Sequence, residues 1–547
     1  MDRRQFSKGA LWSTVFALNG NISSAQNTGG FQDARAAPLP DVLRCKICIV
    51  GAGAAGLTLA RSLAETTDGI MLIESGGHDM DGETQLLYSG QQLGLDYHDL
   101  LACRLRYFGG TTNHWGGYCR ANDPIDYEGR PDLNLPAWPF GVETLMPYVA
   151  DIGTVLGIRA DHFDPDVVLR EKGLDPGLLP DAESNIIQTK LFQLATTLRL
   201  GPKYREDIAA NPRITPYTNL NVTHVQLNDA GTAVRHLDCA TLDGKTTRIE
   251  ADTFVLCCHA IENARLLLAS NDVQTPGIGN ASDHVGRYFM DHIYIRASRF
   301  IPTQTFPMLY DRQVLSKHHL NANLSFTDDY MRAEQMPQYY CRFNPHYVSD
   351  TTRDSMTHLR RDMMKPGDLD FLEDLRQITT ELPDVFRSSS RRFRDYVLPS
   401  YFTLEHRLEQ TPNPASRIVL SDRKDALGNR IADLDWQLHD LDIQAFQRGQ
   451  DIVALEMERL GYGVMEREEI TRAVVEDRVT GHYHHIGTTR MSETAAEGVV
   501  DGDCKVHGID NLFIGGSSTF PTAGYSGPTM MIMAMALRMA NHLRQSA

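Results

Sequence analysis

Three glycines and a glutamate within residues 46–77 have the types and the spacing needed to bind a dinucleotide. Gly51 permits a tight turn, Gly53 lets a pyrophosphate approach the backbone, and Gly56 lets a helix pack closely on a sheet. Glu74, about 20 residues further on, stands where an acid accepts hydrogen bonds from an adenosine ribose. The alternative is a glycine-rich turn in another kind of α/β protein. The spacing predicts a dinucleotide site but does not separate FAD from NAD.

A strand, a turn, a helix and a second strand must position these residues. The apolar run 47–50 is short enough for a buried strand, an apolar helical pattern covers 57–63, and a second strand covers 70–73. The first turn of the helix presents free N–H groups and the positive end of its dipole to the phosphates. In this segment the expected cofactor contacts are Gly51, Gly53, Ala54, Ala55, Gly56, Glu74 and Ser75.

Length and composition set the limits for the rest of the chain. At 547 residues it is too long for one hydrophobic core, so two or more domains are expected. Residues are 42% hydrophobic and 22% charged, as in soluble globular proteins. The net charge of −17 disfavours nucleic acid or an anionic membrane as a partner. No apolar run reaches the roughly 18 residues of a membrane span, so no integral membrane segment is expected.

The first 25 residues resemble an export signal. The run RRQFSK at residues 3–8 resembles a twin-arginine motif, a short apolar stretch follows at 10–18, and small residues at 23–25 suit cleavage. The alternative is an ordinary basic N-terminal tail. The sequence thus predicts export by the twin-arginine route to the periplasm, or secretion, and residues 26–43 form a linker.

Local patterns predict further elements. Residues 185–210 are expected to be helical, 214–249 to form an antiparallel meander, and 260–270 to form an amphipathic helix. The glycine-rich segment 107–117 suits a loop against a flat ligand. The charged run at 387–394 is expected on a solvated face.

Five motifs in one order resemble the glucose–methanol–choline (GMC) family of FAD-dependent alcohol oxidoreductases, over nearly the whole chain after the predicted signal. They lie at residues 51–77, 109–117, 260–268, 484–491 with 499–501, and 511–538. This resemblance, not the spacing, indicates FAD rather than NAD. It implies an α/β fold in which a Rossmann-like FAD-binding domain carries an inserted, mainly antiparallel-sheet substrate domain.

The predicted domain limits follow the motifs. The FAD-binding domain is expected in three parts, the substrate-binding domain between the last two of them, and a cap segment between the first two. The ranges are 44–125, 205–293 and 476–547 for the FAD-binding parts, 126–204 for the substrate or cap segment, and 294–475 for the substrate-binding domain.

The resemblance also implies cofactor contacts outside the dinucleotide turn. Further contacts with FAD are expected at Gly109, Gly110, Thr111, Asn113, His114, Trp115, Gly116, Val222, Gly516, Pro528 and Thr529. The GGTTNHW loop is most similar to the sugar-oxidising branch of the family, which includes pyranose oxidases and glycoside 3-dehydrogenases. There the histidine before Trp can be linked covalently to flavin. The alternatives for His114 are such a bond or simple packing beside the ring.

His484 is the predicted general base. Oxidation of a carbinol needs a base for the hydroxyl proton while hydride leaves for flavin N5, and histidine suits this role because its pKa lies near neutrality. The resemblance places the base at His484, three residues before Gly-Thr. The helix that begins at Pro528 should direct its positive end at the flavin and stabilise its reduced anionic form.

Three positions depart from the family pattern. Gly527 stands where a second catalytic His or Asn is usual, so Ser526 or Tyr525 is expected to replace that group, or the chemistry differs. His259 replaces a usual glycine, which would crowd the adenosine side of the site. Gly515 replaces a common aspartate.

The leading interpretation is FAD-dependent oxidation of an alcohol, on a sugar or glycoside, by an exported dehydrogenase or oxidase. The alternatives are a non-redox flavoprotein, a lyase or decarboxylase, on the same fold, or oxidation of an aromatic or aliphatic alcohol. Electrons would pass to O2 or to a separate carrier such as cytochrome c or a quinone, because the chain has no haem-attachment CxxCH. No metal site is predicted, and the sequence does not indicate an oligomeric state.

Overall fold

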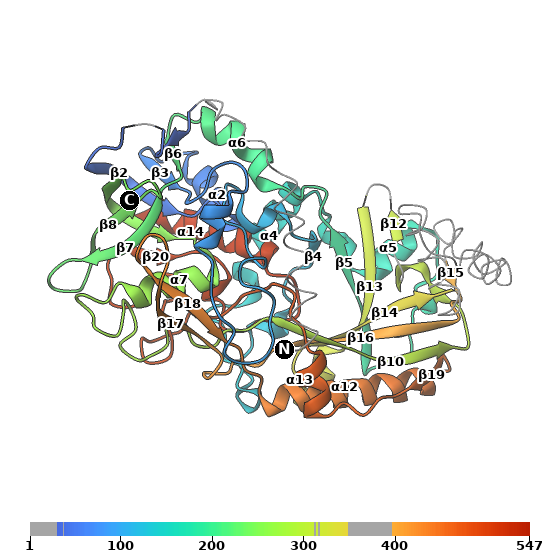
Figure 1. The fold of residues 1–547 in the computed structure, drawn as a ribbon. Helices are drawn as coiled ribbons and strands as arrows, with labels where there is room; N and C mark the ends of the chain where they lie inside the picture. Colours follow the sequence, from blue (N-terminus) through green and yellow to red (C-terminus); the bar gives the residue numbers. More distant parts are fainter. Residues whose placement is uncertain (1–29, 37, 311–312, 316–317, 348–395, 547) are drawn as a thin grey trace, which may run out of the picture.

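Two large β-sheets lie side by side in the computed structural model of the chain (Figure 1). The structure describes residues 30–36, 38–310, 313–315, 318–347 and 396–546. The predicted export signal, the first residues of the predicted linker and the charged run at 387–394 lie outside the described residues.

The first sheet has the order β1-β6-β3-β2-β9-β8-β7, and β20 pairs with β9. Strands β1, β6, β3, β2, β9 and β20 are parallel, whereas β7 and β8 extend the sheet as an antiparallel edge. The bounds are β1 Gln32–Asp33, β2 Val42–Val50, β3 Ile70–Ile73, β6 Ile214–Thr218, β7 Asn221–Leu227, β8 Val234–Ala240, β9 Thr246–Leu256 and β20 Leu512–Ile514.

The apolar runs of the central strands explain their burial. The last four residues of β2 and all four of β3 are buried, as expected where helices cover both faces of a parallel sheet. Helix α2 (Ala54–Leu63) packs against the last helix, α14 (Thr529–Ser546), which in turn contacts α4 (Met146–Leu156). Helix α7 (His259–Ala269) contacts β7 and the β17–β18 hairpin (Arg417–Lys424 and Arg430–Asp435).

The second sheet is antiparallel and has the order β19-β10-β16-β14-β13-β5-β4, with β12 beside β13. Its longest helix, α12 (Asp440–Arg459), packs against β16 and β19 along one side (Figure 1). The bounds are β4 Tyr118–Cys119, β5 Ile187–Leu194, β10 His292–Pro302, β12 Gln313–Leu315, β13 His318–Phe326, β14 Tyr339–His346, β16 Tyr401–Glu409 and β19 Gly463–Glu466.

The remaining described helices and strands are short. They are the pair β11 Phe306–Pro307 and β15 Tyr396–Val397, and helices α3 Gly82–Leu86, α5 Pro165–Glu171, α6 Leu200–Ala210, α8 Asp328–Ala333 and α13 Arg472–Arg478. Within the described part of the chain, no helix combines the length and apolar character needed to cross a membrane.

Two predicted elements are wrong in detail. Residues 185–210 do not form one helix, because 187–194 is strand β5, paired along its whole length with β13, and only α6 is helical. The predicted meander loses its first strand, since β6 joins the parallel sheet beside β3 and only β7, β8 and β9 run antiparallel. Both errors come from long-range strand pairing, which outweighs the local sequence pattern.

The predicted Rossmann-like domain with a mainly antiparallel second sheet is confirmed. The predicted domain limits stay a prediction.

Candidate active site

A cavity of about 630 Å³ is lined by residues from both sheets. Most residues predicted to bind the cofactor line it, together with the predicted base. They are Gly51, Gly53, Ala54, Ala55, Glu74, Ser75, Gly110, Thr111, His114, Trp115, Gly116, Val222, Gly516, Pro528, Thr529 and His484.

Three predicted contacts shape the cavity without lining it. A Cβ at Gly56 would lie 1.9 Å from the carbonyl oxygen of Gly51, so only glycine lets α2 pack this closely on the turn. Gly109 adopts a left-handed conformation with φ of 97°, and the Asn113 amide donates a hydrogen bond to the Phe108 carbonyl oxygen. These residues hold the loops behind the cavity wall.

The dinucleotide turn is built around the Glu74 carboxylate. Its oxygens accept hydrogen bonds from the backbone N–H groups of Ala52, at 2.9 Å, and Gly76, at 3.0 Å, which fixes the turn against the end of β3. Gly53 precedes α2, and a Cβ placed there would meet no protein atom within 4 Å. A glycine that faces open space at a helix N-terminus leaves room for a phosphate group.

The cavity wall also supplies a buried N–H donor without a partner. Arg265 pairs with Glu262 through Nε at 2.7 Å, and its buried Nη1 has no hydrogen-bond partner. Both residues line the cavity. A buried guanidinium nitrogen without an acceptor fits an anionic ligand such as a diphosphate. The open space at Gly53 and this donor together show that the residues present fit FAD.

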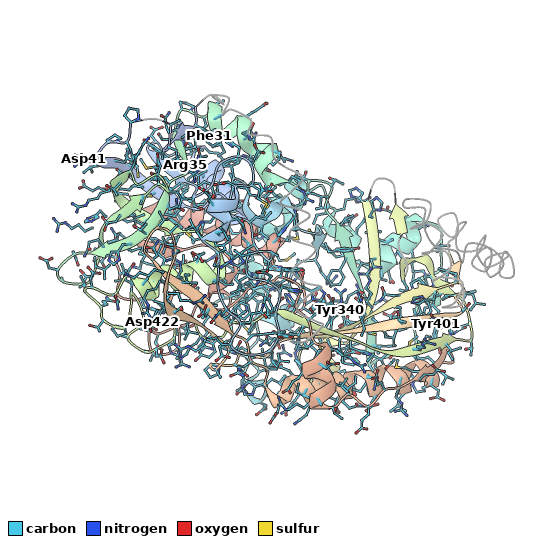
Figure 2. The ribbon with its side chains drawn as sticks, viewed as in Figure 1. Phe31, Arg35, Asp41, Tyr340, Tyr401 and Asp422 are labelled. Carbon is cyan, nitrogen blue, oxygen red and sulfur yellow. The ribbon has the colours of Figure 1, made fainter. Side chains whose placement is uncertain are left out.

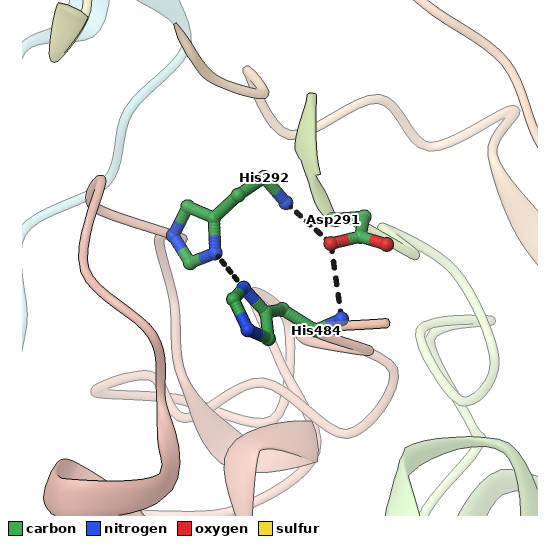
Figure 3. A group of neighbouring side chains, drawn as sticks. All are labelled: Asp291, His292 and His484. Carbon is green, nitrogen blue, oxygen red and sulfur yellow. Dashed lines mark hydrogen bonds between the residues drawn. The ribbon is translucent and has the colours of Figure 1, made fainter. Parts of the chain in front are cut away.

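His484 is held by the segment on which β10 begins. Antiparallel bridges join Met290 to Ile486 and Tyr294 to Thr480, so residues 480–486 run alongside 290–294. Between the bridges, the Nδ1 atoms of His292 and His484 lie 2.8 Å apart (Figure 3). The ring of His484 therefore has a defined orientation, with its Nε2 on the side away from His292.

The hydrogen bonds fix which nitrogen of each ring carries a proton. The Nε2 of His292 lies 3.0 Å from the carbonyl oxygen of Ala523, which can only accept, so Nε2 carries the proton. In a neutral ring Nδ1 is then an acceptor, and it receives the Nδ1–H of His484. The Nε2 of His484 is left as an acceptor, and the residue lines the cavity.

Both imidazoles are neutral near pH 7. Burial lowers the pKa of His292 to about 4 and lowers the pKa of His484 well below its ordinary value, with neighbouring histidines and Arg407 adding to the effect on His484. A neutral His484 with a bare Nε2 can take up a proton from a ligand in the cavity.

Asp291 orders the backbone around this pair. Its Oδ1 accepts hydrogen bonds from the backbone N–H groups of His292 at 2.6 Å and His484 at 3.0 Å (Figure 3). The same oxygen accepts from the backbone N–H of His482 at 3.1 Å, and Oδ2 accepts from the Tyr97 hydroxyl. Asp291, His292 and His484 lie close enough to share a metal ion. Their lone pairs are instead engaged by these donors and by the histidine pair, so the group works as a hydrogen-bonded scaffold.

Ser526 and Tyr525, the predicted replacements for a second catalytic group, do not reach the cavity. The Ser526 hydroxyl donates to the Arg120 carbonyl oxygen, and the Tyr525 hydroxyl donates to Asp123 and accepts from Arg120 Nε. Both side chains are at most 2% exposed. In this structure both hydroxyls are bonded to the 120–123 segment, although the two residues are neighbours of Gly527 in sequence, and their catalytic role stays a prediction.

Gly527 itself lies beside the base. A Cβ at this position would be 3.6 Å from Nε2 and Cε1 of His484 and 3.3 Å from the Tyr118 carbonyl oxygen. Gly527 and His484 both line the cavity. The missing side chain therefore leaves space next to the proton-accepting nitrogen, and no side chain of residues 525–527 fills it.

His259 and Gly515 are explained by their surroundings. His259 has φ of 78°, a conformation that favours glycine, and its ring Nε2 lies 2.6 Å from Nδ1 of His485. This contact anchors the ring in the cavity wall. A Cβ at Gly515 would lie 2.7 Å from Cys257 Sγ, so Cys257 occupies the space that a larger residue would need.

The sequence did not identify His292 or Asp291. His292 begins β10 and Asp291 directly precedes it, far from His484 along the chain. Neither carries a local signal, because their role depends on the pairing of 290–294 with 480–486. The position of His482 depends on the same pairing, because its ring Nδ1 hydrogen-bonds the His292 carbonyl oxygen at 2.8 Å.

Comparison with known proteins agrees with the fold. Residues 412–536 match the family model described as GMC oxidoreductase. Paromamine 6'-oxidase from Streptomyces fradiae is 24% identical over 539 residues, which cover 90% of each chain. The fructose dehydrogenase large subunit from Gluconobacter japonicus is 26% identical over 322 residues, 58% of this chain and 52% of that protein.

Solved structures show the same architecture. Pyridoxine 4-oxidase from Mesorbium loti superposes with a TM-score of 0.57 at 19% identity, over 92% of this chain and 99% of that one. Formate oxidase superposes with a TM-score of 0.54 at 16% identity, over 93% and 99% of the two chains. Taken together, the matched family model and these relatives show that residues 412–536 carry the domain of GMC oxidoreductases and that the chain is similar to oxidases and dehydrogenases that act on CH–OH groups, while the solved structures show the same fold.

Proposed function

We propose that this enzyme oxidises a secondary alcohol of a sugar or glycoside to the corresponding carbonyl compound, with His484 as the general base. The observation that carries the proposal is the hydrogen-bond chain from His484 through His292 to the Ala523 carbonyl, which leaves Nε2 of His484 as an acceptor in the cavity. The names of the relatives, which include oxidases and dehydrogenases of sugars, support the substrate class.

Three residues of this chain have separate roles in the proposed oxidation. FAD, when bound, accepts the hydride that leaves the carbinol carbon. His484 takes the hydroxyl proton on Nε2, and His292 keeps the ring in the orientation and tautomer that this requires. The space beside Gly527 receives the hydroxyl next to Nε2. A general base in this position contributes roughly 10²–10⁴-fold to a rate.

The N-terminus of α14 supports negative charge in the same cavity. Pro528 and Thr529, where the helix begins, line the cavity wall. The first N–H groups of a helix carry partial positive charge and have no partner within the helix. This end of α14 therefore stabilises an anionic cofactor or transition state without rearrangement.

Two modes of FAD retention are open at His114. Its ring lines the cavity, and burial together with the nearby Arg199 lowers its pKa, so the imidazole is neutral and able to form a covalent bond to flavin. The other mode is packing beside the ring without a bond. Denaturation of the yellow holoenzyme in acid distinguishes them, because only a covalent link keeps the colour with the precipitated protein.

Anaerobic bleaching of the flavin tests the function. The purified holoenzyme is mixed without oxygen with sugars, glycosides and aromatic or aliphatic alcohols, and absorbance is followed near the flavin maximum. Bleaching by a sugar or glycoside, with the ketone identified as the product, is expected. Bleaching by aromatic or aliphatic alcohols alone would contradict the substrate class.

One observation favours a second function. Gly527 provides no polar group beside the base, although the family pattern has one, so a non-redox lyase or decarboxylase on this fold is the alternative. Product formation from a substrate while the flavin stays oxidised would establish that alternative and contradict the oxidation.

The electron acceptor and the location complete the proposal. We propose that O2 or a separate cytochrome c or quinone reoxidises the enzyme, and that the RRQFSK run directs export by the twin-arginine route. Replacement of Arg3 and Arg4 together by lysine should leave folded, flavin-loaded precursor in the cytoplasm, as cell fractionation would show. Normal export of the double variant would contradict the signal.

A further inference from the structure

One face of the second sheet forms the end of the cavity near His484. Arg342 on β14 lies opposite Glu405 on β16, and Tyr340 lies opposite Arg407. Opposed residues of an antiparallel ladder share a face, and so do residues two apart on one strand. All four side chains therefore lie on one face, and Figure 2 shows Tyr340 at the junction of the two halves.

The charges on this face do not balance. Glu405 binds Arg407 Nη2 at 2.6 Å and, through its other oxygen, Arg296 Nε at 3.0 Å. No ion pair between described residues uses Arg342, whose guanidinium lies 6.0 Å from the ring centre of Tyr118. Glu405 is therefore hydrogen-bonded to two other arginines, and among the described residues no carboxylate is hydrogen-bonded to Arg342, which adds a positive charge to the cavity wall.

Two further polar groups at this end lack partners. Asn323 is 3% exposed and lines the cavity, yet its Oδ1 accepts no hydrogen bond. The Nε–H of Arg407 is also buried without an acceptor. Buried polar groups in native proteins are nearly always hydrogen-bonded, so the three groups together indicate a ligand that supplies both negative charge and hydroxyls.

We infer that the substrate is a polyhydroxylated carboxylate, of the uronic or aldonic acid class, whose carboxylate binds Arg342 while a hydroxyl bonds Asn323. This inference deepens the proposed function and rests on it. A guanidinium binds a carboxylate through two parallel N–H···O bonds, a geometry that lysine cannot reproduce. Arg342 is therefore a specificity residue for the oxidation.

A carboxylate fits the charge better than a phosphate. At this end of the cavity Arg407 is already paired with Glu405, whereas Arg342 has no ion pair among the described residues, so one guanidinium is available for one singly charged carboxylate. A phosphate ester would bring close to two. Arg342, Arg407 and His484 all line the same cavity. The charge of Arg407, which shares the sheet face with Arg342, contributes to the lowered pKa of His484, so the carboxylate site lies on the same side of the cavity as the base.

The first test compares matched neutral and acidic substrates by anaerobic flavin reduction of the holoenzyme. The pairs are glucose with glucuronate and galactose with galacturonate, and glucuronamide keeps the shape of glucuronate without its charge. Acids should reduce the flavin with an apparent dissociation constant about 10–150-fold lower than their neutral partners, the usual range for a charged hydrogen-bonded pair. Equal constants would overturn the inference.

The second test replaces the arginine. Arg342→Met should remove the preference for acids over their neutral partners, whereas Arg342→Lys should restore part of that preference. Arg296→Met is the matched control, because Arg296 belongs to the same sheet, is already paired with Glu405 and has a side chain that is 71% exposed. A preference for acids that survives Arg342→Met would overturn the inference.

A binding measurement separates this inference from the proposed function. Gluconate should raise the melting temperature of the wild-type holoenzyme but not of Arg342→Met, and sorbitol should raise neither. A shift with glucose 6-phosphate and none with gluconate would overturn the carboxylate. If gluconate binds through Arg342 while no sugar or sugar acid bleaches the flavin, the inference about the anion stands and the proposed oxidation fails.

Discussion

The two ends of the cavity recognise their ligands by different means. At the dinucleotide turn, Gly51 and Gly53 bring the backbone close to the ligand, and Glu74 holds the turn in place. At the other end, the side chains come from three different strands of the second sheet. They are Asn323 on β13, Arg342 on β14 and Arg407 on β16. A ligand bound by backbone requires glycines at fixed spacing, whereas a ligand bound by side chains requires only the correct strand register.

This difference explains what the sequence could predict. The turn, its helix and the acid at Glu74 were predictable because the spacing that matters lies within one short segment. The position of His484 came from the resemblance to the GMC family. The partner His292 was not predictable, since it reaches His484 only through the bridges at 290–294. Adjacency of Ser526 and Tyr525 to Gly527 likewise says nothing about side-chain direction, and their hydroxyls are bonded to the 120–123 segment.

The largest expected effect is at the base. His484→Ala should lower the rate of flavin reduction by roughly 10²–10⁴-fold, because the proton acceptor is removed, while FAD stays bound at the distant turn. Stopped-flow absorbance without oxygen measures the rate, and the flavin-to-protein ratio measures the cofactor. Reduction at the wild-type rate would exclude His484 as the base.

The next effect concerns the partner of the base. His292→Phe should slow flavin reduction by about 10–100-fold, less than loss of the base itself, because His484 keeps its ring but loses the acceptor that fixes its tautomer. His292→Gln offers an acceptor again and should recover part of the rate. An unchanged rate in His292→Phe would mean that another group orients His484.

The pH profile gives this pair a signature that a purely structural role lacks. The pKa of His292 is lowered to about 4, so the residue is neutral above that pH and accepts the proton of His484. Below it, protonated His292 donates instead and His484 Nε2 loses its lone pair. The reduction rate should therefore remain level through pH 6.5, the ordinary histidine pKa, and fall only near pH 4. A decline centred near 6.5 in rapid pH-jump measurements would contradict this mechanism.

A smaller effect is expected at the dinucleotide turn, where two glycines do different work. Gly53→Ala meets no protein atom, so the fold should survive, but the added methyl group occupies the ligand side and should weaken FAD binding by about 5–150-fold. Gly56→Ala instead meets the Gly51 carbonyl oxygen and should lower the melting temperature of the apoprotein. Titration of apoprotein with FAD and thermal unfolding separate the two. Equal losses of stability would contradict a ligand-facing Gly53.

The smallest effect on catalysis is expected at Tyr525 and Ser526, next to the base in sequence. Tyr525→Phe removes a hydroxyl that bonds Asp123 and Arg120 inside the wall, so it should lower the free energy of unfolding by about 1–3 kcal/mol and leave the reduction rate within twofold of wild type. Ser526→Ala should also leave the rate unchanged, because its hydroxyl is bonded to the Arg120 carbonyl. Denaturant unfolding and stopped-flow reduction measure the two quantities. If Tyr525→Phe slowed reduction without loss of stability, its hydroxyl would have to reach the substrate, and side chains near Gly527 would take part in catalysis after all.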